Sequence, residues 1–198
     1  MATKEVSETL ADEAATKLGG IDILVNNAGT NRRKQAIDVT EDDYKTLMAI
    51  NLESVFWLCQ AAYPHLCKSE CGKVVNIGSM TTLTGIGGMP VYGMTKAAIG
   101  QLTKTLALEW AKDNIQVNCI APGFIRTPLN EAGLFSDPKK AKFLDHRIPM
   151  KREGTPEELI GTALLSASPA SSYTTGQVFA IDGGFLAGGS WLDLEAGD

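Results

Sequence analysis

The sequence of 198 residues has only two histidines and four cysteines, and its basic residues are outnumbered by acidic ones, 18 to 23. A net charge of −5 leaves no basic surface of the kind that binds DNA or RNA. No apolar run reaches the ~18 residues that a membrane helix needs. The opening MATKEVSETL alternates charged and small apolar residues and lacks the apolar centre of a secretory signal. We therefore expect no nucleic-acid partner, no membrane association and a cytoplasmic location.

The sequence also lacks the cysteine patterns of disulfide and zinc sites. Cys59 and Cys119 stand apart from the others in apolar segments, which favours reduced thiols over a disulfide framework. His65, Cys67 and Cys71 lie close together, but their spacing matches no common zinc motif and no second group of ligands accompanies them. We expect no metal site.

What is present is a regular alternation of strands and helices. Hydrophobic residues make up 44% and charged residues 21%, which is ordinary for a globular domain. Short apolar runs predict buried strands over 21–27, 72–79, 114–123 and 176–184. Helical patterns cover 4–18, 40–66 and 90–112, and a further helix begins at Thr155. Long crossovers between short strands favour a doubly wound, parallel α/β sheet with helices on both faces.

The first of these helices shows an apolar repeat. Val6, Leu10, Ala14 and Leu18 recur at every fourth position and predict one apolar stripe along the helix over 4–18. We expect this stripe to be the face that packs.

Tyr92 and Lys96 carry the first chemical signal. They are four residues apart on one predicted helix, so both side chains share a face. A lysine ammonium close to a phenol lowers the phenol's pKa, which lets the tyrosine exchange a proton with an alcohol or carbonyl. A solvated pair is the commoner meaning of this spacing taken alone. Ser79 favours catalysis, because it ends a predicted strand, where ligands bind in open α/β sheets. Its hydroxyl either binds a substrate oxygen or caps a turn.

Three further features lie at strand ends or inside a helix. Asn51 interrupts the helix over 40–66, where asparagine is a poor helix former. It is either exposed, or buried and orienting a water molecule or a backbone group. Asn26–Gly29 and Pro122–Gly123 each follow a predicted strand directly. Each is either a plain turn or a place where a flat ligand can approach the backbone.

Together these residues resemble the short-chain dehydrogenase/reductase family. The matching segments are NNAG at 26–29, INLES at 50–54, GS at 78–79, YGMTK at 92–96, PGFIRT at 122–127 and YTTGQVFAIDGG at 173–184. Their order and spacing are those of the family, and they cover nearly the whole chain. The resemblance implies a single, partial Rossmann-like domain over 1–188, followed by a loose tail over 189–198.

The resemblance also implies an activity, the NAD(P)-dependent interconversion of a secondary alcohol and a ketone. Tyr92 would be the general acid/base, Lys96 would lower its pKa and hold the nicotinamide ribose, and Ser79 would position the substrate oxygen. Asn51 would support a water-linked proton relay. Cofactor contacts are implied for Asn27, Ala28, Gly29, Tyr92, Lys96, Pro122, Gly123, Ile125 and Thr127. Packing of the long helices would give a homo-oligomer, a dimer or a tetramer.

A basic run follows NNAG, where the family often builds its substrate pocket. Arginine suits bidentate contact with a carboxylate, so Arg32 is predicted to contact substrate, unless the run at 32–34 is only a solvated charge cluster. NNAGTNRRK and the closing segment are similar to gluconate and deoxygluconate dehydrogenases, and LEWAKDNIQVN is similar to tropinone-reductase-like members. We expect a sugar acid or a polyol as substrate.

The sequence departs from the family pattern ahead of its first predicted strand. The family begins with a strand and a TGxxxGxG turn whose amides hold the pyrophosphate, and no such turn precedes residue 21. We therefore expect an N-terminally truncated sheet with the strand over 21–27 at its edge, and no readable preference between NAD and NADP. Two alternatives stay open: an inactive subunit that associates with full-length relatives, and a chain that does not fold stably alone.

Overall fold

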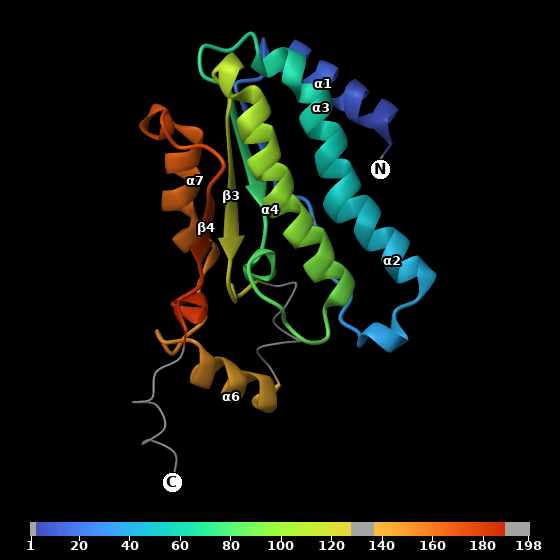
Figure 1. The fold of residues 1–198 in the computed structure, drawn as a ribbon, viewed down its shortest axis with the longest axis vertical. Helices are drawn as coiled ribbons and strands as arrows, with labels where there is room; N and C mark the ends of the chain where they lie inside the picture. Colours follow the sequence, from blue (N-terminus) through green and yellow to red (C-terminus); the bar gives the residue numbers. More distant parts are fainter. Residues whose placement is uncertain (1–2, 128–136, 189–198) are drawn as a thin grey trace.

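The fold is a parallel sheet of four strands, seen in a computed structural model that describes residues 3–127 and 137–188. The strands are β1 (Ile23–Asn26), β2 (Lys73–Ile77), β3 (Gln116–Pro122) and β4 (Val178–Ile181). They are paired in the order β1-β2-β3-β4, so all their carboxyl ends meet at one edge of the sheet (Figure 1). The predicted parallel α/β sheet is confirmed.

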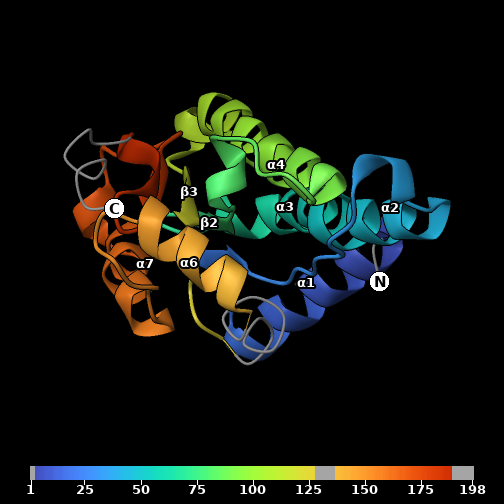
Figure 2. The ribbon, with the colours of Figure 1, turned by 90° about the horizontal axis from the view of Figure 1, so that it is seen from below.

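Helices cover the two faces of this sheet unequally. They are α1 (Lys4–Leu18), α2 (Glu41–Met48), α3 (Ser54–Leu66), α4 (Pro90–Trp110), α6 (Pro138–Arg147) and α7 (Ile160–Ala167). Figure 2 shows α1, α3 and α4 on one face and α7 on the other. Because β4 continues the strand order while its connecting helix α7 lies on the opposite face, the last crossover has the opposite hand to the first two.

The predicted helix over 40–66 is continuous but not uniform. The Thr40 side chain caps it by accepting the Asp43 amide hydrogen in a capping box. A wide π-helical turn, η2 (Ala49–Glu53), joins α2 to α3. π turns are often found at functional sites, and this one contains the predicted Asn51.

The main core lies between the sheet and the helices α3 and α4. Its buried members are Val55, Cys59, Ala62, Leu66, Val74, Ile99, Leu106, Ala107, Trp110, Ile115, Val117 and Cys119. A second cluster lies near the carboxyl ends of the strands and consists of Met80, Phe124, Leu144, Ile148 and Phe185. Burial of each large apolar side chain stabilises the fold by ~1.5–3 kcal/mol. These two clusters therefore hold the carboxyl ends of the strands in place.

One burial prediction is wrong. The apolar stripe of α1 is not its packed face: Leu10 and Leu18 are 53% and 78% exposed, whereas Ser7 and Ala11 are buried. Small side chains at a helix contact allow two axes to come close, and α1 packs extensively against α3. The strand β1 lies at the edge of the sheet, as expected for the strand over 21–27, and Val25 is 54% exposed there.

No helix in the part of the chain that the structure describes is long and apolar enough to cross a membrane. The predicted tail over 189–198 lies outside the described residues.

Candidate functional site

The carboxyl ends of the strands form one side of a cleft of about 540 Å³. Nine of the predicted site residues line it: Asn27, Gly29, Ser79, Tyr92, Lys96, Pro122, Gly123, Ile125 and Thr127. The other three predicted residues, Ala28, Asn51 and Arg32, are not part of its lining. Cavities of roughly 300–1,000 Å³ are typical of small-molecule sites, so the cleft is large enough for a ligand.

Ser79 both lines the cleft and caps a turn. It follows β2 in an extended conformation, at the start of the short 3-10 turn η3 (Met80–Thr82). Its Oγ accepts a hydrogen bond of 3.1 Å from the Thr81 amide. That bond uses a lone pair of the oxygen and leaves the hydroxyl proton available for donation. The two meanings considered for Ser79 are therefore compatible.

Lys96 is anchored on the backbone beside Tyr92. Its Nζ donates a hydrogen bond of 2.7 Å to the carbonyl of Ile77 and lies 5.8 Å from the centre of the Tyr92 ring. Burial lowers the pKa of Lys96 to about 8. An amine that titrates so close to neutrality is rare outside functional sites.

Burial raises the pKa of Tyr92, and two neighbours partly oppose this effect. A hydrogen bond with Ser79 lowers the pKa, and so does the positive charge of Arg33. The sequence led us to expect that Lys96 would lower it. In this structure the effective cation is Arg33, while the Lys96 ammonium is directed to the carbonyl of Ile77.

Asn51 is fully buried and fixes the backbone of the loop after β1. Its Oδ1 accepts the amide hydrogen of Thr30 and its Nδ2 donates to the carbonyl of Thr30, both at 2.8 Å. A Cβ on Gly29 would lie 3.4 Å from Asn51 Oδ1 and 3.6 Å from Lys96 Nζ. Of the two alternatives for Asn51, burial with a bond to a backbone group is the one observed.

The two asparagines of the NNAG segment have different positions. Asn27 is exposed and lines the cleft. Asn26 is buried and donates to Asn76 Oδ1 at 2.8 Å, and Asn76 in turn donates to Thr103 Oγ1 at 3.0 Å. This relay joins β1, β2 and α4 beneath the cleft. Sequence analysis missed Asn76 and Thr103, because nothing in their local pattern marks them.

The opposite wall of the cleft is the segment after β3, residues 124–127. Arg126 N donates to Gly154 O at 2.8 Å, and Gly154 N donates to Phe124 O at 2.9 Å. Ile125 and Gly154 thus pair like neighbouring parallel strands. A Cβ on Gly154 would lie 2.7 Å from Ile125 Cδ1, so glycine permits this close approach.

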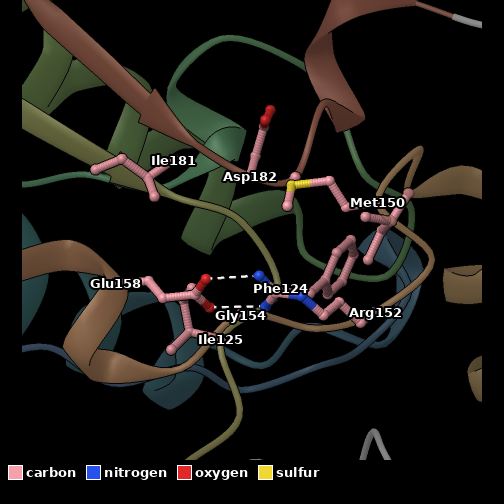
Figure 3. Close-up of a pocket in the computed structure, with 10 residues that line it drawn as sticks. Phe124, Ile125, Met150, Arg152, Gly154, Glu158, Ile181 and Asp182 are labelled. Atoms are coloured by element: carbon pink, nitrogen blue, oxygen red, sulfur yellow. Dashed lines mark hydrogen bonds and ion pairs between the residues drawn. The ribbon is translucent and has the colours of Figure 1, made fainter.

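An ion pair supports this second wall from outside. Arg152 makes two bonds to the Glu158 carboxylate, at 2.8 and 2.7 Å (Figure 3). Glu158 also accepts the Thr155 amide hydrogen. Figure 3 shows this pair beside a small cavity of about 80 Å³ next to Phe124. Sequence analysis found Thr155 as a helix cap but missed Arg152 and Glu158, although Glu158 stands at the capping-box position.

The basic run after NNAG is divided between two roles. Arg32 pairs with Asp42 at 2.6 Å and with Asp43 at 3.1 Å, at the start of α2. Lys34 also binds Asp43, at 2.5 Å. Arg33 is exposed and lines the cleft. The structure therefore places Arg33 in the position that we predicted for Arg32.

The lining of the cleft fits the nicotinamide–ribose end of a dinucleotide. An ammonium has three N–H donors, and the Ile77 carbonyl accepts one from Lys96. The other two have no partner among the described residues and suit the hydroxyls of a ribose. Asn27 and Thr127 add polar groups to the same lining. Gly29 and Gly123 have no side chains, so a ligand can approach the backbone at these two positions.

Comparison with known proteins identifies the family. The family model described as Enoyl-(Acyl carrier protein) reductase matches residues 1–186. The chain belongs to the short-chain dehydrogenase/reductase family. Members of this family are oxidoreductases that act on CH–OH groups with NAD or NADP, so the predicted family, fold class and cofactor type are confirmed.

Individual relatives within the family span two groups. The chain is 42% identical over 190 residues to a tropinone reductase homolog of Arabidopsis thaliana, covering 94% of this chain and 70% of that protein. It is 42% identical over 179 residues to 2-dehydro-3-deoxy-D-gluconate 5-dehydrogenase of Escherichia coli K12, covering 90% of this chain and 70% of that protein. A crystal structure of a gluconate 5-dehydrogenase from Burkholderia cenocepacia, in complex with NADP and tartrate, matches with a TM-score of 0.91 and 37% identity. That match covers 94% of this chain and 73% of the solved one.

Proposed function

We propose that this chain interconverts a secondary alcohol and a ketone in the cleft at the carboxyl ends of its strands. The observation that carries the proposal is that Ser79, Tyr92 and Lys96 line one cavity, in which Ser79 lowers the pKa of Tyr92. A bound nicotinamide would supply or accept the hydride. The remaining requirement, transfer of a proton at the substrate oxygen, falls to residues of this chain.

Each of these residues has a distinct part. The Ser79 hydroxyl donates to the substrate oxygen, because the bond that it accepts from the Thr81 amide leaves its own proton free. Tyr92 gives or takes the proton at that oxygen. Lys96 holds the ribose hydroxyls of the cofactor, while the positive charge of Arg33 favours the tyrosinate when proton transfer occurs. Asn51 acts through the backbone of Thr30, which it holds at the cofactor side of the cleft.

The substrate that the cleft suits best is a sugar acid. Arg33 lines the cavity, and its positive charge lowers the pKa of Tyr92. A guanidinium can bind a carboxylate through two parallel hydrogen bonds. The gluconate 5-dehydrogenase and 2-dehydro-3-deoxy-D-gluconate 5-dehydrogenase among the relatives support this choice. Met89 and Phe124 give the same cleft apolar surface for the carbon chain.

The first test is a fluorescence titration of the purified chain with NADH and with NADPH, following Trp57 and Trp110. We expect saturable quenching by at least one nucleotide. No quenching up to millimolar nucleotide, in a chain that melts cooperatively, would contradict the proposal.

Substrate class is tested with two arginine variants that differ by one position. Turnover is measured with gluconate-type acids and with uncharged polyols. Arg33→Gln should raise the KM for the acids about tenfold or more and leave the KM for the polyols unchanged, since it removes a charged hydrogen-bond partner of the carboxylate alone. Arg32→Gln is the matched control, because Arg32 is paired with Asp42 outside the cleft. Equal effects of the two variants would refute the role of Arg33.

A second candidate is an inactive subunit that assembles with full-length relatives. It is favoured by the free edge of β1, where Ile23 and Val25 are 45% and 54% exposed, and by exposed apolar residues on the long helices, such as Leu108. Light scattering of the chain alone and mixed with a full-length relative separates the candidates. A homo-oligomer that turns over substrate supports the first, and a mixed oligomer without turnover by this chain supports the second.

A further inference from the structure

Thr82 lies in η3, between the strand end that carries Ser79 and the helix that carries Tyr92 and Lys96. It is wedged between two glycines. A Cβ on Gly78 would lie 2.7 Å from Thr82 Oγ1, and a Cβ on Gly100 would overlap the methyl group of Thr82. Any other residue at either position would displace this side chain, so the local packing is built around it.

The hydroxyl of Thr82 forms a bridge whose direction is unambiguous. The Ser79 amide, which can only donate, gives a hydrogen bond of 3.1 Å to Thr82 Oγ1. The same hydroxyl donates its proton at 3.0 Å to the carbonyl of Lys96, which can only accept. One oxygen therefore ties the backbone of Ser79 to the backbone of Lys96.

The segment from Ile77 to Ser79 is in this way fastened to Lys96 twice. The Ile77 carbonyl accepts a hydrogen bond from the Lys96 ammonium. The Ser79 amide is linked to the Lys96 carbonyl by two hydrogen bonds of the Thr82 hydroxyl. The distance between the Ser79 hydroxyl and the face of α4 depends on both connections.

We propose that Thr82 is a positioning residue, which fixes Ser79 and Ile77 against α4 so that Ser79, Tyr92 and Lys96 meet one substrate oxygen. This inference rests on the proposed function for the meaning of the arrangement, but the arrangement itself can be tested without cofactor or substrate. A residue that acts only by filling space would depend on the Thr82 methyl group, whereas a positioning residue depends on its hydroxyl.

Two variants separate hydroxyl from methyl. Thr82→Val keeps the shape of the side chain and removes the hydroxyl, and Thr82→Ser keeps the hydroxyl and removes the methyl group. Thr105→Val is the matched control, because the Thr105 hydroxyl also bonds a carbonyl of α4 but at its exposed side, away from the cleft.

The readout is the pKa of Lys96, followed by NMR in lysine-labelled protein and assigned with Lys96→Met. In Thr82→Val we expect the pKa of Lys96 to fall by roughly 0.5 pH units or more. The Ile77 carbonyl would no longer be held against the ammonium, and the hydrogen bond that favours the charged amine would weaken. Tyr92 on α4 and Cys119 on β3 also face Lys96, and neither is altered by these variants. Thr82→Ser and Thr105→Val should titrate like the wild type.

The opposite pattern would overturn the proposal. If Thr82→Val titrates like the wild type, or if Thr82→Ser shifts the pKa of Lys96, the hydroxyl does not position the segment. The serine variant decides the question alone should the valine variant fail to fold. In an active enzyme, Thr82→Val should also lower kcat about tenfold with little change in the KM for the nucleotide, and Thr82→Ser should restore it. Absence of turnover in the wild type would count against the proposed function and leave the titration result standing.

Discussion

The two walls of the cleft are held by different kinds of contact. The reaction wall, which we define as residues 77–82 and 90–96, is held by buried bonds between side chains and backbone, such as Lys96 to Ile77. The loop wall, defined as residues 124–127, is held by its pairing with Gly154 and by exposed ion pairs such as Arg152–Glu158. Salt screens exposed pairs, while buried bonds are insensitive to it.

This difference indicates a division of labour. The groups proposed for proton transfer must keep a fixed geometry, since small displacements are costly to the rate. The loop wall, where the resemblance implies cofactor contacts at Ile125 and Thr127, is held by weaker, exposed pairs. Damage to the reaction wall should therefore lower kcat, and damage to the loop wall should mainly raise KM.

The largest effect is expected from Tyr92→Phe, which removes the proposed acid/base from the reaction wall. We expect kcat to fall by roughly 10²–10⁴-fold, the usual contribution of such a group. Nucleotide binding should persist, because the ring and Lys96 remain. Steady-state kinetics and the fluorescence titration measure the two quantities. Tyr173→Phe is the control, since Tyr173 is fully exposed. An unchanged kcat in Tyr92→Phe would refute the proposed role of Tyr92 in proton transfer.

Gly123→Ala is expected to have the next largest effect, on the loop wall. Its Cβ would lie 2.6 Å from Asp182 Cα, and that backbone is held because the Asp182 carboxylate accepts two amide hydrogens. We expect a loss of about 1–3 kcal/mol in the free energy of unfolding and a raised KM for the nucleotide. Gly161→Ala, in open space on α7, should be neutral or stabilising. Equal melting curves of the two variants would contradict the close packing of Gly123.

Lys96→Met sharpens the contrast through pH. The pKa of Lys96 is lowered to about 8 in the folded protein, from an ordinary 10.5. Above about pH 8 the folded state releases this proton while the unfolded state keeps it. The wild type should therefore gain about 2 kcal/mol of stability relative to Lys96→Met on going from about pH 7 to about pH 10. Urea denaturation at several pH values measures the difference. A constant difference would mean that the buried amine does not titrate in this range.

The smallest effect is expected from Glu158→Gln, which weakens the outer support of the loop wall. Arg152 lowers the pKa of Glu158 to about 2, so the pair stays charged throughout the neutral range. We expect the KM for the nucleotide to rise by about two- to fivefold at low salt, with kcat unchanged and the difference disappearing at high salt. A fall in kcat instead would show that the two walls are not separable.

Much of the reaction wall could be predicted from the sequence because its residues stand at local landmarks. Ser79 follows a strand, and Tyr92 and Lys96 stand in the opening turns of a helix that begins with proline. Local patterns of this kind survive folding almost unchanged. The resemblance to a family then assigned roles that the patterns alone left open.

Ile125 and Thr127 of the loop wall could be predicted from the resemblance, but the contacts that hold this wall could not, because they join segments that are distant in sequence. The pairing of Ile125 with Gly154 has no local signature. The choice between Arg32 and Arg33 depends on how one loop turns, and adjacent side chains in a loop point in directions that only tertiary structure decides. The predicted packing face of α1 is wrong for a related reason, because the helix packs against α3 through the small residues Ser7 and Ala11.

The π turn at Asn51 has a geometric consequence for the whole second helix. Asp43, Leu47, Asn51, Val55 and Cys59 are all buried, and each follows the last by four residues. In an ideal α-helix of about 3.6 residues per turn, such a series would drift around the axis by about 160° over its length. The wide turn slows this drift and keeps the series in phase with the sheet. Removing one residue from 49–53 would rotate Asn51 away from Thr30 and release the loop beside the cleft.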